Sequence, residues 1–234
     1  SVMDITAALY LNVINHKPHN PDWEDRDRVV WSAGHKAPAL YTALGMSGYF
    51  NISEIVSLRQ LNSKFQGHPH SLKLPGVEFS TGSLGQGLGL AVGSALAGKL
   101  NKKDYKVFCI MGDGEQQEGS VWESAMSASQ YKLDNLTAII DKNDLQIDGK
   151  VSDVMGIEPL IDKYRAFGWN VHSIDGHNLD LLELCLAIPQ IQPTIIIAKT
   201  IKGKGVSFME ACPKDFHGKA PCKEEVIKAL EELI

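Results

Sequence analysis

Residues 106–114 read Lys-Val-Phe-Cys-Ile-Met-Gly-Asp-Gly, an apolar run that ends in a turn with glycine on both sides of an acid. The run has the length of a strand and does not alternate between apolar and polar residues. Strands of this kind are typical of parallel sheets that are covered by helices on both faces. The segment therefore predicts a buried strand with a carboxylate, Asp113, just beyond its carboxyl end.

Similar apolar runs recur along the chain and alternate with helical patterns. We expect further strands at 136–141, 169–174 and 193–198, and helices at 4–15, 38–45, 53–61, 84–100, 121–132, 159–167, 179–188 and 224–233. Strand–helix–strand repetition indicates an α/β fold, a doubly wound and mostly parallel sheet with helices on both faces. We expect one domain over residues 1–234, because no linker or internal repeat interrupts the pattern.

Composition excludes several classes of protein. The chain has 234 residues, 44% of them hydrophobic, and a formal net charge of −5, which argues against nucleic acid as its main partner. No apolar run approaches the roughly 18 residues of a membrane span, and the first residues lack a signal-peptide pattern. Four scattered cysteines, Cys109, Cys185, Cys212 and Cys222, predict reduced thiols and a cytoplasmic protein.

The Gly112-Asp113-Gly114 loop carries the first chemical signal. Glycines allow a ligand to approach the backbone closely, and the amides of such a loop and of a following helix attract anions. We expect that helix to begin with a capping box between Ser120 and Glu123. A carboxylate beside an anion-binding loop is suited to a complex of Mg²⁺ with a diphosphate.

The next predicted strand, 136–141, is followed by a second oxygen ligand, Asn143. If the two strands are adjacent, Asn143 and Asp113 lie at the same edge of the sheet, where ligands of parallel sheets bind. The alternative is that both segments are simple turns, since Gly, Asp and Asn all favour turns. Strand patterns before both segments favour the metal site.

These motifs resemble those of transketolases, in particular their N-terminal, diphosphate-binding part. Asp113 and Asn143 match the thiamine diphosphate motif, and further likenesses follow in the order of the family over nearly the whole chain. They are Asn20-Pro-Asp-Trp23, Asp25-Arg-Asp-Arg28, Gly34-His35, Gly67-His68-Pro69, Pro75-Gly-Val-Glu78, Thr81-Gly-Ser-Leu-Gly-Gln-Gly87, Ile147-Asp-Gly149, Asp175-Gly-His177, Lys199-Thr-Ile-Lys-Gly-Lys-Gly205 and His217-Gly218.

The resemblance implies a set of site residues. Asp113 and Asn143 would bind Mg²⁺ through their side chains and Leu145 through its carbonyl, with Ca²⁺ or Mn²⁺ as alternative ions. Thiamine diphosphate would contact His35, Gly82, Ser83, Leu84, Gly112, Asp113, Gly114, Asn143, Ile201 and His217. Catalytic roles would fall to His35, His68, His217 and Glu118. The family commonly has proline where Ser83 stands, and the residues around His217 also depart from its pattern.

Several residues can be interpreted in two ways from the sequence. Glu118 is either a favourable partner of a helix dipole or, as the resemblance implies, a relay between the two active sites of a dimer. Lys202 and Lys204 either steer phosphates or form a solvated loop. The glycine series from Gly85 to Gly98 lacks dinucleotide-motif spacing, and we interpret it as close helix packing at a subunit interface.

The resemblance also implies what lies outside this chain. In transketolases the glutamate that contacts the pyrimidine ring belongs to a second domain of the neighbouring subunit. We therefore expect one subunit of a split transketolase, which transfers a two-carbon ketol group between sugar phosphates. It would need a partner chain with the pyrimidine-binding domain and would self-associate through the dimer interface. The alternatives are another thiamine diphosphate enzyme, similar to deoxyxylulose-phosphate synthase or to an unusual-sugar transketolase, and a non-catalytic binding module.

Overall fold

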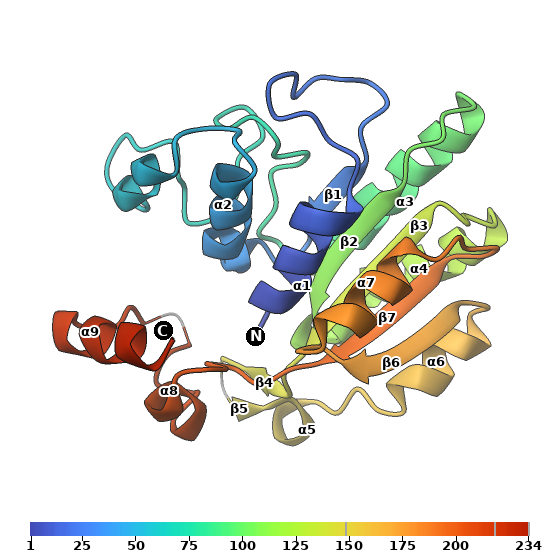
Figure 1. Ribbon diagram of the computed structural model, residues 1–234. Coiled ribbons are helices and arrows are strands. Elements are labelled where there is room, and N and C mark those ends of the chain that lie inside the picture. Colours follow the sequence, from blue (N-terminus) through green and yellow to red (C-terminus); the bar gives the residue numbers. More distant parts are fainter. Residues whose placement is uncertain (148, 218, 234) are drawn as a thin grey trace.

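The computed structural model describes residues 1–147, 149–217 and 219–233. Its centre is a sheet of five strands in the order β1-β2-β3-β7-β6, in which every pairing is parallel (Figure 1). The strands are β1 (Arg28–Trp31), β2 (Val107–Gly112), β3 (Leu136–Lys142), β6 (Asn170–Asp175) and β7 (Thr194–Lys199). A small antiparallel hairpin, β4 (Leu145–Gln146) and β5 (Gly149–Lys150), follows β3.

Helices cover both faces of this sheet, which confirms the predicted α/β class. One face packs on α1 (Met3–Ala7), the π-helix η1 (Ala8–Val13), α2 (Ala37–Met46) and α7 (Leu179–Ala187). The other face packs on α3 (Gln86–Leu100), α4 (Gly119–Gln130) and α6 (Leu160–Ala166). Alternate residues of β2 belong to the two cores, Phe108 and Ile110 to the first and Cys109 and Met111 to the second, as strand geometry requires.

The remaining elements are short or lie at the carboxyl end of the sheet. They are the 3₁₀-helices η2 (Gly34–Lys36), η3 (Ile52–Ser57) and η4 (Gly114–Gln117), and the helices α5 (Val151–Val154), α8 (Ser207–Ala211) and α9 (Lys223–Glu232). In Figure 1, α8 and α9 form an arm that projects from the sheet below the lobe that carries α2. Within the described residues, no helix is long and apolar enough to cross a membrane.

Several local expectations were wrong. The sequence analysis missed β1, and the helix expected at 53–61 is only the short η3. The capping box at Ser120 is absent because α4 begins at Gly119, two residues before the expected start at 121, with Glu118 as its N-cap. The hydroxyl of Ser120 instead donates to the carbonyl of Gly85 at 3.1 Å and links α4 to the start of α3.

The glycine series of α3 includes one position packed inside this chain and one exposed at its surface. A methyl group on Gly87 would lie 2.3 Å from the Cβ of Ser32 and 2.5 Å from its Cα, so the helix rests directly on the end of β1. Gly93 has no atom within 4 Å of such a methyl group and is exposed. The interpretation of the series as an interface therefore does not hold for Gly87.

These two glycines predict opposite effects of the same substitution. Gly87→Ala should lower the free energy of unfolding by about 2–3 kcal/mol, because helix and strand must separate. Gly93→Ala should raise it by about 0.5–1 kcal/mol, because alanine favours the helix and meets no obstacle. Urea unfolding followed by circular dichroism measures both. Equal effects of the two variants would contradict the packing described here.

Candidate active site

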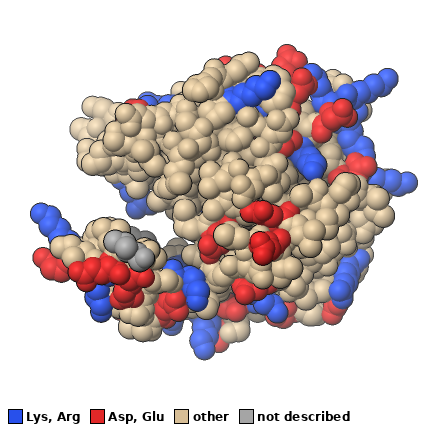
Figure 2. Space-filling model, in the orientation of Figure 1, with Lys and Arg blue, Asp and Glu red and all other residues tan. Residues whose placement is uncertain are grey.

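A cavity of about 680 Å³ lies at the carboxyl ends of the strands. The loops after β1, β2, β3 and β7 all reach it, and His217 comes from the loop between α8 and α9. Figure 2 shows the molecule hollowed between the lobe that carries α2 and the arm formed by α8 and α9. Of the predicted site residues, the cavity is lined by His35, His68, Gly82, Leu84, Gly112, Asp113, Gly114, Glu118, Asn143, Leu145 and His217. Ser83 and Ile201 do not line it, and Asp148 and Gly218 lie outside the described residues.

Asp113 is a buried carboxylate held by backbone amides. Its Oδ1 accepts from the N–H of Gly114 at 2.8 Å, and its Oδ2 accepts from the N–H of Asp144 at 2.5 Å. The left-handed backbone of Asp144, with φ of 61°, lets the loop after β3 turn toward Asp113. Burial raises the pKa of Asp113, and none of the described lysines, arginines or histidines forms an ion pair with it.

Asn143 lies at the end of β3 beside Asp113. Its amide nitrogen is 3.4 Å from both the carbonyl and a carboxylate oxygen of Asp141, and its Oδ1 accepts from the N–H of Leu145 at 3.2 Å. Asp113, Asn143 and the carbonyl of Leu145 thus offer the oxygen ligands that Mg²⁺ prefers. These residues fit a divalent cation, because a buried carboxylate without a cationic partner gains most from one.

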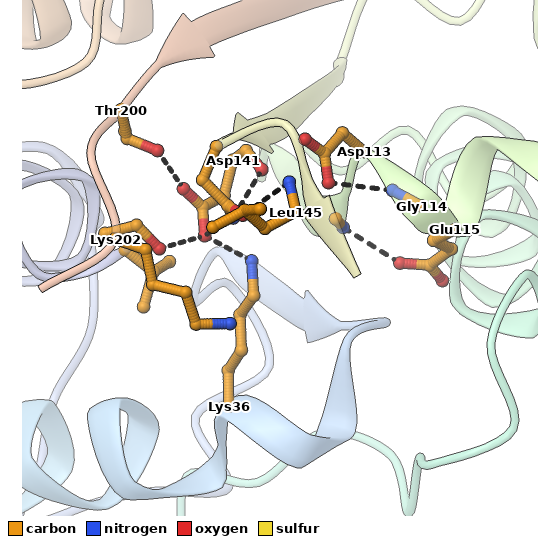
Figure 3. Close-up of polar contacts among 12 residues, drawn as sticks. Lys36, Asp113, Gly114, Glu115, Asp141, Leu145, Thr200 and Lys202 are labelled. Atoms are coloured by element: carbon orange, nitrogen blue, oxygen red, sulfur yellow. Dashed lines mark hydrogen bonds and ion pairs between the residues drawn. The ribbon is translucent and has the colours of Figure 1, made fainter. Parts of the chain in front are cut away.

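A second buried carboxylate at the same edge is neutralised within the protein. Asp141 forms an ion pair with Lys36, which follows β1, and accepts from the hydroxyl of Thr200, which follows β7, at 2.5 Å. Figure 3 shows both side chains pointing to Asp141. Burial alone would raise the pKa of Asp141, but the charge and the hydrogen bonds of Lys36, together with Thr200, lower it to about 2. The sequence analysis missed this group because its members are far apart along the chain.

Glu115, also missed, connects three segments around the glycine loop. The side chain is buried and accepts hydrogen bonds from the N–H of Gly85 at 2.8 Å, from the N–H of Gly112 at 3.1 Å and from the hydroxyl of Ser32. Burial raises the pKa of Glu115. Because the bonds join the starts of α3 and η4 to the end of β1, Glu115 fixes the loop that carries Asp113.

Histidines and lysines form the wall of the cavity that faces Asp113. The rings of His35 and His217 are stacked with centroids 6.4 Å apart, and the Nζ of Lys202 lies 2.6 Å from the Nδ1 of His217. Partial burial, then the positive charges of Lys36, His217 and Lys202, lower the pKa of His35 to about 4. Burial and the two lysines also lower the pKa of His217. His35 is therefore a neutral ring at pH 7 in a cationic surrounding suited to anions.

The other predicted residues occupy distinct positions. The ring of His68 packs on Gly82, where a methyl group would lie 3.0 Å from its Cδ2. Glu118 lines the cavity, and its carboxylate accepts no hydrogen bond from the part of the chain that the structure describes, so its relay role stays a prediction. His177, part of the Asp175-Gly-His177 motif, bonds to Asp4 at 2.6 Å and accepts from the N–H of Ile201 at 2.8 Å.

Comparison with known proteins identifies the family. A family model described as transketolase, thiamine diphosphate binding domain, matches residues 1–233. The chain is 45% identical to the 6-deoxy-6-sulfo-D-fructose transketolase subunit of Clostridium sp. (strain MSTE9), with 90% of this chain and 78% of that protein covered. It is 42% identical to an apulose-4-phosphate transketolase subunit of Phocaeicola vulgatus, with 100% of this chain and 83% of that protein covered.

Comparison with a solved structure supports the same family. The transketolase of Campylobacter jejuni matches with a TM-score of 0.90 and 36% identity, over 98% of this chain but only 37% of that one. The parallel sheet and its strand-end loops are thus those of a thiamine diphosphate-binding α/β fold. The chain belongs to the transketolase family and comprises its N-terminal, thiamine diphosphate-binding part.

The buried ion pair predicts a stability effect. Lys36→Met should lower the free energy of unfolding by about 3 kcal/mol, because it leaves Asp141 charged and buried without its ion-pair partner. The double variant Lys36→Met/Asp141→Asn should recover part of this loss. The exposed pair of Lys99 and Asp134, 2.8 Å apart, is the control, and Lys99→Met should cost less than about 1 kcal/mol. Equal losses for the two lysines in urea unfolding would contradict the argument.

The histidine wall predicts a titration. In the chain without cofactor, the ring of His35 should titrate near its pKa of about 4, as followed by NMR of its Cε1–H. The unfolded chain binds the proton more readily, so the stability contribution of His35 falls as pH drops from 6.5 toward 4. Lys36→Met should raise this pKa, because it removes a nearby positive charge, whereas Lys99→Met should leave it unchanged. A pKa near 6.5 in the unmodified chain would refute this description of the wall.

Proposed function

We propose that this chain is one subunit of a two-chain, Mg²⁺-dependent transketolase. It would transfer a two-carbon ketol group from a ketose phosphate to an aldose phosphate, with the pyrimidine-binding domain supplied by a second chain. The observation that carries the proposal is Asp113, which is buried beside Asn143 and has no cationic partner among the residues that the structure describes. It lies at the edge of a cavity whose opposite wall is cationic. In this proposal residues 1–234 act as one diphosphate-binding domain.

The residues divide between the two ends of the cofactor complex. Asp113, Asn143 and the carbonyl of Leu145 would hold the metal, and Gly114 at the start of η4 would contact the diphosphate. The positive charge of Lys202, which lines the cavity, complements the same anion. Gly112 leaves the backbone open to it, since a methyl group there would meet only the end of Lys36, 3.9 Å away, whereas one on Gly114 would lie 3.2 Å from the side chain of Gln146. Gly82 and Leu84 would border the middle of the cofactor.

Thiamine diphosphate supplies the cleavage and formation of the carbon–carbon bond. The chain's own histidines would position the sugar and move its protons. His35 has a lowered pKa of about 4, so its neutral ring can accept as well as donate a hydrogen bond. His68 and His217 line the same cavity and would contact the hydroxyls that gain or lose a proton.

Relatives support assembly from separate chains and leave the sugar open. The Clostridium and Phocaeicola vulgatus relatives are each named as one subunit of a transketolase, which favours a second chain, and their names give different sugars. An unusual-sugar transketolase is therefore the main alternative to one that uses common sugar phosphates. Self-association and a cytoplasmic location are further parts of the proposal.

Removal of the metal ligand tests the proposal. In a complex with its partner chain, Asp113→Asn should weaken Mg²⁺-dependent binding of thiamine diphosphate at least about a hundredfold and abolish ketol transfer, because the metal loses a carboxylate ligand. Asp134→Asn, at the amino end of β3, is the matched control and should change neither. Isothermal calorimetry and a coupled assay measure the two quantities.

Two outcomes would count against the proposal. Unchanged cofactor binding in Asp113→Asn would contradict the metal site. Ketol transfer by this chain without a partner would contradict the two-chain enzyme. If the complex binds the cofactor but transfers no ketol group from any ketose, the binding-module alternative is favoured.

A further inference from the structure

The arm formed by α8 and α9 carries both of the exposed cysteines of the protein. All four cysteines are free thiols, and Cys109 and Cys185 are buried in the core. Burial raises the pKa of both of these thiols, which disfavours the thiolate that reacts with oxidants. Cys212 and Cys222 are exposed and stand at the C-cap of α8 and the N-cap of α9. The accessible thiols therefore flank the connection that carries His217.

Contacts within the arm show that α8 and α9 run antiparallel. The hydroxyl of Ser207, the first residue of α8, donates to the carboxylate of Glu232, the last residue of α9, at 2.9 Å. One residue further along α8, the ring centroid of Phe208 lies 5.1 Å from the Nζ of Lys228, which belongs to the preceding turn of α9. The contacts thus move backward along α9 as the chain moves forward along α8.

This antiparallel register places the two cysteines at the same end of the arm. Cys212 follows Phe208 by four residues, and Cys222 precedes Lys228 by six. At about 1.5 Å per residue, the two segments advance about 6 Å and about 9 Å from their shared contact toward that end. The cysteines are therefore at similar levels, where a disulfide, which joins Cα atoms roughly 4.4–6.8 Å apart, can close across the hairpin.

The connection between the helices links the position of Cys212 to that of His217. The N–H of Asp215 donates to the carbonyl of Cys212 at 3.1 Å, two residues before His217. The ring of Phe216 packs edge to face on Phe208 of α8, with centroids 5.5 Å apart. Phe216 and His217 both line the cavity of the candidate active site. A change at the end of α8 is therefore passed to the cavity wall.

The sulfur of Cys222 has a partner that a disulfide would replace. In the capping box of α9 the side chain of Cys222 accepts from the N–H of Glu225, and the carboxylate of Glu225 accepts from the N–H of Cys222 at 2.7 Å. To reach Cys212 the sulfur has to leave that amide, so the first turn of α9 is rearranged. Because His217 lies on the chain between the two cysteines, its place beside His35 changes with the bond.

We propose that Cys212 and Cys222 form a reversible disulfide in response to hydroperoxides and that this bond displaces His217 from its place in the cavity. The pair is a modification site that goes beyond the proposed function, and only its effect on ketol transfer rests on that function. Disulfides of proteins whose thiols are normally reduced are usually transient and sense oxidants.

The oxidation needs no reactant other than the peroxide. The thiolate of one cysteine attacks the O–O bond of hydrogen peroxide, so that a sulfenic acid forms and hydroxide leaves to become water. The sulfur of the other cysteine then attacks the sulfenic sulfur, the S–S bond forms, and the hydroxyl group leaves as a second water. The two thiols lose two electrons and two protons, which the peroxide gains. A reducing thiol such as dithiothreitol reverses the bond by thiol–disulfide exchange.

The test exposes the complex of this chain with its partner to hydrogen peroxide and maps disulfides by mass spectrometry of peptides. Cys212→Ser and Cys222→Ser each remove one sulfur, and serine at the second position keeps an N-cap for α9. Cys185→Ser is the matched control, because its thiol is buried outside the arm. NMR of the Cε1–H groups reports on His217, with His172 of β6 as the reference ring.

We expect peroxide to join Cys212 and Cys222 in the unmodified complex and in Cys185→Ser. The resonance of His217 should shift on oxidation and return with dithiothreitol, whereas that of His172 stays in place. Ketol transfer by the oxidised complex should fall about tenfold or more and recover on reduction, because small displacements of catalytic groups have large effects on rate. The Cys212→Ser and Cys222→Ser complexes should keep their activity in peroxide.

Three results would overturn the proposal. Peroxide might oxidise the thiols singly, or leave them unchanged, without a bond between Cys212 and Cys222. The bond might form while the resonance of His217 stays in place. In a complex that transfers ketol groups, the rate might be the same before and after the bond has formed. Disulfide mapping and NMR keep the test separate from the proposed function, because both are measured whether or not the complex is active.

Discussion

The parallel register of the sheet is the constraint on which the site depends. Gly112 of β2 pairs with Asp141 of β3, and Lys142 of β3 pairs with Lys199 of β7, so three strands end at the same level. The loops that follow these strands therefore lie close together. The loop after β1 reaches the same place, because its Lys36 forms an ion pair with Asp141. Residues separated by more than a hundred positions are thereby brought into one cavity. The site is thus formed by residues that the parallel strands bring together at their carboxyl ends.

Two buried carboxylates at that edge show how the protein separates structure from ligand binding. Asp141 receives Lys36 and Thr200, and its charge is satisfied inside the fold. Asp113 receives only the amides of Gly114 and Asp144 and has no cationic partner among the described residues. Burial of an uncompensated carboxylate is unfavourable. Asp113 therefore favours the binding of a cation, and it does so next to a loop suited to anions.

The sequence predicted those parts that depend on local patterns. The buried strands, the glycine loop and the adjacency of Asp113 and Asn143 follow from apolar runs and from the rule for parallel strands. It did not predict β1, which has only four residues, or the start of α4, where packing against Gly85 replaced the capping box. Lys36 and Glu115 were missed because their partners are distant in sequence. Only packing in three dimensions gives such residues their roles.

The most direct test of the central claim is the position of the metal. Manganese can replace magnesium, and the anomalous diffraction of Mn²⁺ locates it in crystals of the complex with thiamine diphosphate. We predict one Mn²⁺ at the carboxyl ends of β2 and β3, bound by a carboxylate oxygen of Asp113, the side-chain oxygen of Asn143 and the carbonyl of Leu145. A metal bound elsewhere, or thiamine diphosphate bound with Asp113 still held only by backbone amides, would contradict the account.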